Sequence, residues 1–201
     1  MSDVGLLFVG AVLIINGVML LGTITDKAAA PLNFFVGVLQ VVTPTFLIMT
    51  ADGDRAIIAG AAGLYLFGFT YLWVGINAAT GWPGEGLGWF SLFVAAAAVG
   101  YAIYTWQTGG RVFTVIWLAW ALLWFLFFLL LALGRTRLSR FTGLVAIAEG
   151  VLTAAVPAAL ALTGLWRDST GAALIAAVLA VVALAVLWWA GRVPGRPASA
   201  A

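Results

Sequence analysis

Residues 112–134 read VFTVIWLAWALLWFLFFLLLALG and carry no charged side chain. An α-helix rises 1.5 Å per residue, so about 20 apolar residues are enough to cross the roughly 30 Å hydrocarbon core of a bilayer. This stretch is both long enough and apolar enough to do so. It therefore predicts a membrane-spanning helix.

Aromatic residues of this helix are expected on one face. Phe113, Trp117, Trp120 and Trp124 follow one another at spacings of four, three and four residues. Residues at these spacings share a helix face. Tryptophan usually lies at the bilayer interfaces, whereas Trp120 and Trp124 lie near the middle of the stretch. The pattern indicates either a stripe that packs against neighbouring helices or the wall of a narrow pathway for a small, flat, neutral solute.

The whole chain has the composition of a membrane protein. Of its 201 residues, 65% are hydrophobic and 8% are charged, which is typical of a single transmembrane domain over residues 1–201 and of no soluble domain. Cysteine and histidine are absent, which excludes disulfides, thiol nucleophiles and metal sites built from these residues. The net charge of +2 gives no reason to expect a nucleic-acid partner. We therefore expect neither an enzyme nor a bound cofactor or metal.

Hydrophobic runs of about 20 residues, separated by short polar segments, predict an all-α polytopic fold. A weak repeat, Phe-x-x-x-Val, occurs near the start of the second, fourth and sixth runs. It favours three helical hairpins around a common axis, which is one way to enclose a pore. We expect a channel core over 1–165, an additional span over 166–190 and a cytoplasmic tail over 191–201. The predicted spans are 4–23, 31–50, 56–79, 88–106, 112–134, 141–165 and 171–190.

Basic residues between the spans predict the orientation. Six of them would lie on one side of the membrane and three on the other. The positive-inside rule assigns the richer side to the cytoplasm, so we expect the N-terminus outside and the C-terminus inside. The richer side holds Lys27, Arg135, Arg137, Arg140, Arg192 and Arg196, and the other side holds Arg55, Arg111 and Arg167.

Asn16 stands at the end of an apolar stripe in the first span. Leu6, Val9 and Leu13 precede it in steps of three and four residues, so the four side chains share a face. We interpret the amide of Asn16 either as forming a hydrogen bond to a neighbouring helix or as a polar contact for a solute.

Glu149 is the only carboxylate expected within a span. A carboxylate at the bilayer centre costs about 2.5–3.5 kcal/mol on insertion scales, and such residues usually face a bundle interior or a wet cavity. Thr142 and Thr153 are expected on the same helix face. We interpret Glu149 in one of two ways. Its side chain either forms an interhelical hydrogen bond or caps a helix, or it is a polar binding site for a hydrogen-bonding solute.

Five motifs occur along the chain: NFFVG at 33–37, LFGFTYL at 66–72, WFSLFVA at 89–95, WLAWxxLW at 117–124 and IAEGxLTA at 147–154. Together they resemble the bacterial amide/urea channel family, the AmiS/UreI family, and the likeness covers about residues 4–165. The resemblance implies a six-helix protomer of three helical hairpins with its own pore, assembled as a hexameric ring. It also implies passage of urea or short aliphatic amides down their gradient.

The resemblance further implies which residues line the pore. Carried over by motif position, the constriction consists of Val9, Leu13, Phe67, Tyr71, Trp117, Trp120, Leu123 and Trp124, with Asn16 and Glu149 as nearby polar contacts. Leu6, Thr70 and Thr153 complete the candidate pore-lining and solute-binding residues.

The chain departs from the gated urea channels of this family in its short loops TADGDRA and QTGGR, its lack of histidine and its seventh span. It is therefore more similar to the ungated amide-transporter branch. We expect a passive channel for urea, acetamide or similar neutral amides, without histidine gating. It would lie among the lipids of the bacterial inner membrane as a homohexamer. Two alternatives stay open: a proton-coupled amide transporter that uses Glu149, and a membrane scaffold or receptor without transport.

Overall fold

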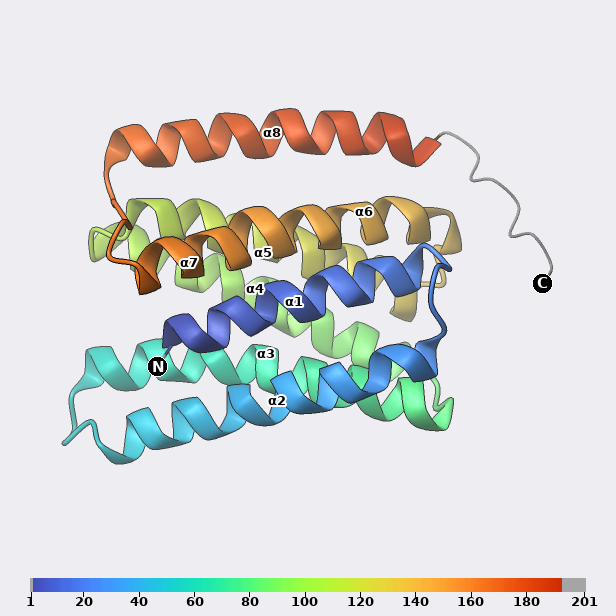
Figure 1. Ribbon diagram of the computed structural model, residues 1–201, viewed down its shortest axis with the longest axis horizontal. Coiled ribbons are helices and arrows are strands. Elements are labelled where there is room, and N and C mark those ends of the chain that lie inside the picture. The colour runs from blue at the N-terminus through green and yellow to red at the C-terminus, as the bar shows by residue number, and fades with distance from the viewer. Residues whose placement is uncertain (1, 193–201) are drawn as a thin grey trace.

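Residues 2–192, the part of the chain that the structure describes, form helices joined by short turns. In the computed structural model the helices run side by side along the longest axis (Figure 1). Seven segments of this part are long and apolar enough to cross a bilayer. The chain is therefore a multi-pass membrane protein, which confirms the expected all-α fold. Of the expected tail, residues 193–201 lie outside the described part. The segments are α1 (Ser2–Leu20), α2 (Asp26–Met49), α3 (Arg55–Thr80), α4 (Glu85–Gln107), α5 (Arg111–Phe127) with the π-helix η1 (Phe128–Ala132), η2 (Thr136–Leu138) with α6 (Ser139–Glu149), the π-helix η3 (Gly150–Ala155) and α7 (Val156–Leu162), and α8 (Thr170–Arg192).

Side chains in the loops determine where several helices begin and end. The hydroxyl of Thr25 accepts a hydrogen bond from the backbone N–H of Ala28 at 3.3 Å, and this cap starts α2 at Asp26 rather than at the expected residue 31. The C-cap of α3 is Gly81, with a φ of 76°. Glycine adopts this left-handed conformation without steric cost.

Three helix pairs build the core. α2 packs along α3, α4 packs along α5, and α1 packs along the segment from α6 to α7. The first two pairs are hairpins of sequence neighbours. The third joins the first helix of the core to the last one, and contacts of α1 with α2, α3 with α4 and α5 with α6 complete a ring.

α1 and the segment formed by α6 and η3 approach closely because their glycines face each other. A Cβ atom on Gly10 would lie 2.7 Å from the carbonyl oxygen of Gly150, and one on Gly17 would lie 2.5 Å from that of Gly143. No side chain fits at such distances, and small residues are what allow helices to pack this closely in a membrane. This contact fixes the helix that carries Glu149 against α1.

α8 lies outside the six-helix core, along the side formed by α5 and α6 (Figure 1). Just before α8, the carboxylate of Asp168 accepts a hydrogen bond from the backbone N–H of Val112 at 3.1 Å. Towards its other end, the ring of Trp188 contacts that of Phe141 edge to face, with 5.1 Å between the centroids. Most leucine and valine side chains of α8 are exposed, as expected of a helix that faces lipid.

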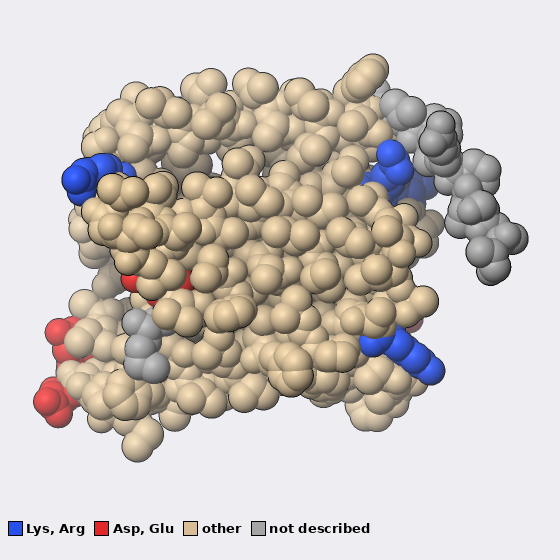
Figure 2. Space-filling model, viewed as in Figure 1, with Lys and Arg blue, Asp and Glu red and all other residues tan. Residues whose placement is uncertain are grey.

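Charged side chains gather towards the two ends of the bundle, and the surface between them is uncharged (Figure 2). A bilayer requires such an uncharged belt. Which end faces the cytoplasm stays a prediction from the basic residues.

Candidate functional site

Two cavities extend into the core from opposite ends. The larger has a volume of about 330 Å³ and lies between the C-terminal halves of α1, α3 and α5. The smaller has a volume of about 200 Å³ and lies between the N-terminal halves of the same helices. We call them the Asn77 cavity and the Tyr101 cavity after one lining residue of each. They have no lining residue in common.

Six buried side chains separate these cavities, and we call them the central layer. Three helices contribute two residues each, four positions apart, which is about one helical turn. The first residue of each pair lines the Tyr101 cavity and the second lines the Asn77 cavity. The pairs are Val9 and Leu13 on α1, Phe67 and Tyr71 on α3, and Trp120 and Trp124 on α5, and each of the six is at most 4% exposed.

Phe67 makes most of the ring contacts of the central layer. Its ring centroid lies 4.7 Å from that of Trp120 and 5.0 Å from that of Trp124, both at nearly perpendicular angles. The Tyr71 ring follows at 6.3 Å. Edge-to-face contacts of this kind are the favourable geometry for aromatic pairs. Phe67 therefore fixes the spacing between the two tryptophans.

Both central tryptophans have their indole N–H groups occupied. Trp120 Nε1 donates to the hydroxyl of Thr153 at 2.9 Å, and that hydroxyl donates to the carbonyl of Glu149 at 2.6 Å. Trp124 Nε1 points to the hydroxyl of Thr70 at 3.4 Å. Both indole N–H groups thus bind threonines within the protein. The tryptophans therefore offer ring surface, and Thr70 and Thr153 hold them in place.

Asn16 forms a reciprocal pair with Asn33 of α2. Asn16 Nδ2 donates to Asn33 Oδ1 at 2.9 Å, and Asn33 Nδ2 donates to Asn16 Oδ1 at 2.7 Å. Both side chains are buried, although Asn16 also lines the Asn77 cavity. The interhelical hydrogen bond that the sequence analysis considered is thus present.

Glu149 lies behind the central layer. It is 6% exposed, and its Oε2 atom has no hydrogen-bond partner within residues 2–192. Glu149 and Thr153 line a third cavity, of about 400 Å³, between α5, the α6–α7 segment and α8. The hydroxyl of Tyr71 is likewise without a hydrogen-bond partner in the described chain. Thr153 connects Glu149 to the central layer, because its hydroxyl donates to the Glu149 carbonyl and accepts from Trp120.

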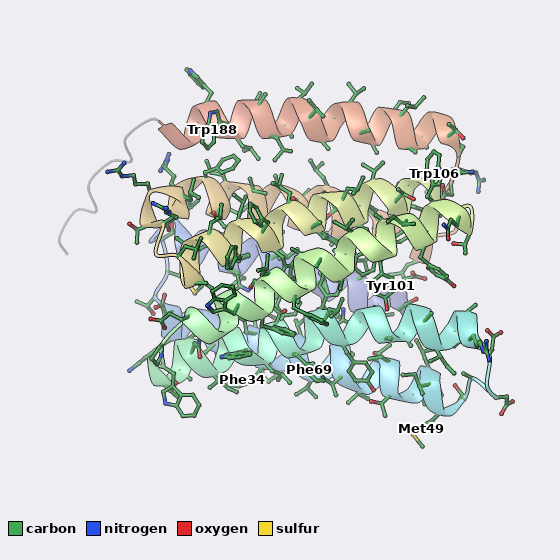
Figure 3. All side chains as sticks on the ribbon, turned by 180° about the vertical axis from the view of Figure 1, so that it is seen from behind. Phe34, Met49, Phe69, Tyr101, Trp106 and Trp188 are labelled. Carbon is green, nitrogen blue, oxygen red and sulfur yellow. The ribbon has the colours of Figure 1, made fainter. Side chains whose placement is uncertain are left out.

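The remaining candidate residues lie at different depths. Leu6 and Trp117 line the Tyr101 cavity. Trp117 stacks on Tyr101, with 4.6 Å between the ring centroids and 17° between the planes; Tyr101 is labelled in Figure 3. Leu123 is fully buried and lines none of the three cavities. It belongs to the same hydrophobic core as Trp124.

Sequence reasoning missed three polar residues that the structure brings to this region. Asn33 is the partner of Asn16, Gln40 lines the Tyr101 cavity, and Asn77 lines the Asn77 cavity. Each is a polar residue inside an apolar span, which was the available signal. No spacing rule connects them, because they come together only when the helices pack.

The described residues include no cluster of three or more acidic side chains that could hold a metal ion. A sequence model described as AmiS/UreI family transporter matches residues 1–165. The chain belongs to the AmiS/UreI family. This match confirms the AmiS/UreI likeness seen in the motifs. Members of the family are transporters and channels and not enzymes.

Curated relatives of this AmiS/UreI protein include two transporters. A Mycolicibacterium smegmatis protein named as an amidate substrates transporter is 57% identical over 193 residues, which are 96% of this chain and 91% of that protein. The Rhodococcus erythropolis transporter AmiS2 is 57% identical over 165 residues, which are 82% of this chain and 80% of that protein.

The solved structures include the urea channel of Helicobacter pylori. It is 36% identical, with a TM-score of 0.75, and the match covers 83% of this chain and 100% of that one. The fold of the AmiS/UreI protein is therefore that of the urea channel over the 83% of this chain that the match covers. The family match ends at residue 165, before α8 begins.

Proposed function

We propose that the chain is a passive, ungated channel for small neutral amides such as urea and acetamide. The observation that carries this proposal is the central layer, which brings aromatic and aliphatic surface between two cavities that open from opposite ends. A flat, neutral amide can stack between the ring faces and gives up less hydration than an ion does. An ion would lose far more hydration than such a layer returns. The names of the relatives agree with this solute class.

The 13 residues predicted from the sequence are part of this proposal in four roles. The central layer and Trp117 form the narrow passage, Leu6 and Asn16 lie at its two approaches, and Thr70, Leu123 and Thr153 support the rings. Glu149 supplies a buried polar group at the third cavity. The proposed location is the bacterial inner membrane with the N-terminus outside, the proposed assembly is a homohexamer in lipid, and the proposed channel core is residues 1–165.

Stopped-flow swelling of proteoliposomes tests the proposal. Vesicles with the purified protein should take up urea or acetamide faster than empty vesicles, while sodium chloride should enter both equally slowly. Uptake no faster than in empty vesicles would refute the channel. Chemical cross-linking in the membrane should give a six-protomer species, and a smaller largest species would contradict the hexamer.

A proton-coupled amide transporter is the second candidate. It is favoured by one observation, the buried Glu149 carboxyl, whose Oε2 has no hydrogen-bond partner in the described residues. This candidate requires that labelled acetamide accumulate above its outside concentration when a pH gradient is imposed, and that an uncoupler abolish the accumulation. A passive channel only equilibrates the label.

A further inference from the structure

Gln40 on α2 has a buried side chain without a hydrogen-bond partner. It is 1% exposed, and its Oε1 atom has no partner within the described chain. The side-chain amide provides one strong acceptor and two donors. A buried polar group that is left unpaired destabilises a fold, so such a group needs an explanation in its function or environment.

The side chain lies on the approach to the central layer. Gln40 lines the Tyr101 cavity together with Val9, Phe67 and Trp120. Those three residues form the face of the central layer that meets this cavity. A solute in the Tyr101 cavity would therefore be within the same small space as the amide of Gln40.

Neighbouring residues hold Gln40 in this position. A Cβ atom on Gly5 of α1 would lie 2.5 Å from Gln40 Oε1, so the amide occupies space that only a glycine leaves free. A Cβ atom on Gly68 of α3 would lie 2.9 Å from the backbone carbonyl oxygen of Gln40. Pro44, four residues later, has no N–H to donate to this carbonyl. Glycines on two helices thus accommodate both the amide and the backbone of Gln40.

We infer that Gln40 is a binding station for the carboxamide group of the solute, immediately before the central layer. This inference rests on the proposed function and specifies its substrate class. A primary amide, like urea, carries a carbonyl acceptor and N–H donors on one flat group, which is the complement of the Gln40 amide. In the structure Oε1 is buried against Gly5, so the pairing requires the amide to rotate towards the Tyr101 cavity. Two antiparallel hydrogen bonds would then replace water as the solute leaves it. A molecule without N–H groups completes only part of this pairing, and a polar site rejects such analogues.

Gln40→Met tests this inference because it keeps the length of the side chain and removes the hydrogen bonds. Acetamide uptake would be measured by stopped flow in proteoliposomes over a range of concentrations. We expect the half-saturating concentration to rise about two- to tenfold, the factor for one hydrogen bond. The preference for acetamide over N,N-dimethylacetamide should fall by a similar factor. An unchanged half-saturating concentration and preference would overturn the inference.

Thermal stability separates a binding role from a structural one. Since the amide is unpaired in the fold, Gln40→Met should unfold at the same or a higher temperature than the wild type. A lower unfolding temperature would mean that Gln40 stabilises the protein, and this would also overturn the inference.

Gly5→Ala gives a second, independent variant. Its Cβ atom meets Gln40 Oε1 and should displace the amide, so this variant should share the transport defect of Gln40→Met. Gly100→Ala is the matched control, because a Cβ atom at that exposed helical position meets nothing within 4 Å. Equal transport by both variants would count against the station. Wild-type vesicles that take up no amide would instead refute the proposed function itself, so the two failures are distinguishable.

Discussion

Trp120 donates its indole N–H to the hydroxyl of Thr153 at 2.9 Å, across the interface between α5 and η3. Thr153 in turn donates to the carbonyl of Glu149. One of the two tryptophan rings of the central layer is therefore held in place by a residue that lines the third cavity. Its orientation depends on a helix that contributes no side chain to the central layer.

Replacing Thr153 by valine should release the Trp120 ring. The change keeps the side-chain shape and leaves a buried indole N–H without its acceptor, which costs about 1–3 kcal/mol. We expect Thr153→Val to lower the free energy of unfolding in detergent by this amount and to slow acetamide uptake. Thr153→Ser retains the hydroxyl and should behave like the wild type. Equal stability of the valine variant would show that the indole finds another acceptor.

Phe67 should set the size limit of the passage. Phe67→Leu removes the ring between Trp120 and Trp124 and keeps an apolar side chain. A barrier lower by about 1 kcal/mol for a larger solute would raise its rate about fivefold. We expect butyramide to gain in this way relative to acetamide, as measured by proteoliposome swelling. Phe69→Leu is the control, since Phe69 (Figure 3) lies on the same helix but is 49% exposed. A gain in both variants would contradict the assignment.

The Asn16–Asn33 pair should stabilise the contact between α1 and α2. Asn33→Ala removes the two hydrogen bonds with Asn16, which leaves the Asn16 amide unpaired, and a third to the carbonyl of Ala29. Interhelical hydrogen bonds in membranes contribute about 0.6–1.7 kcal/mol each. We expect a loss of about 1–2 kcal/mol in unfolding free energy, and a double alanine variant that is hardly less stable than Asn33→Ala. Additive losses would show that the two amides act separately.

Transport should be nearly independent of pH between 5 and 7. The chain has no histidine, the side chain that normally titrates in this interval. We expect urea permeability to change less than about twofold, in the wild type and in Glu149→Gln, because the carboxamide keeps a carbonyl acceptor at that position. A steep pH profile that the Glu149→Gln variant abolishes would instead identify Glu149 as a gate or a proton carrier.

The core should conduct without α8. Deletion of residues 170–201 retains the segment that matches the family and the two cavities that meet at the central layer. We expect this truncation to keep acetamide permeability per protomer and to unfold at a lower temperature, since the contact of Phe141 with Trp188 is lost. Full loss of permeability in a folded truncation would show that α8 belongs to the channel core.

Periodicity explains why much of this architecture could be predicted from the sequence. Spacings of three and four residues indicated the face shared by Trp120 and Trp124, and the structure places both rings in the buried layer. Hydrogen-bond partners could not be predicted from periodicity, because the pairing of Asn16 with Asn33 depends on how two helices meet. Gln40 was likewise visible as a polar residue, yet only the packing of Gly5 and Gly68 around it reveals its position.

The π-helix η3 changes which residues before and after it share a helix face. A π-turn contains one residue more than an α-turn, and one residue corresponds to a rotation of about 100° in an α-helix. Pro157 favours this irregularity because it has no N–H for the carbonyl of Thr153, four residues earlier. Removing a single residue between Gly150 and Ala155 would therefore turn α7 about its own axis relative to α6. Insertions and deletions in this short segment would be far more damaging than most substitutions there.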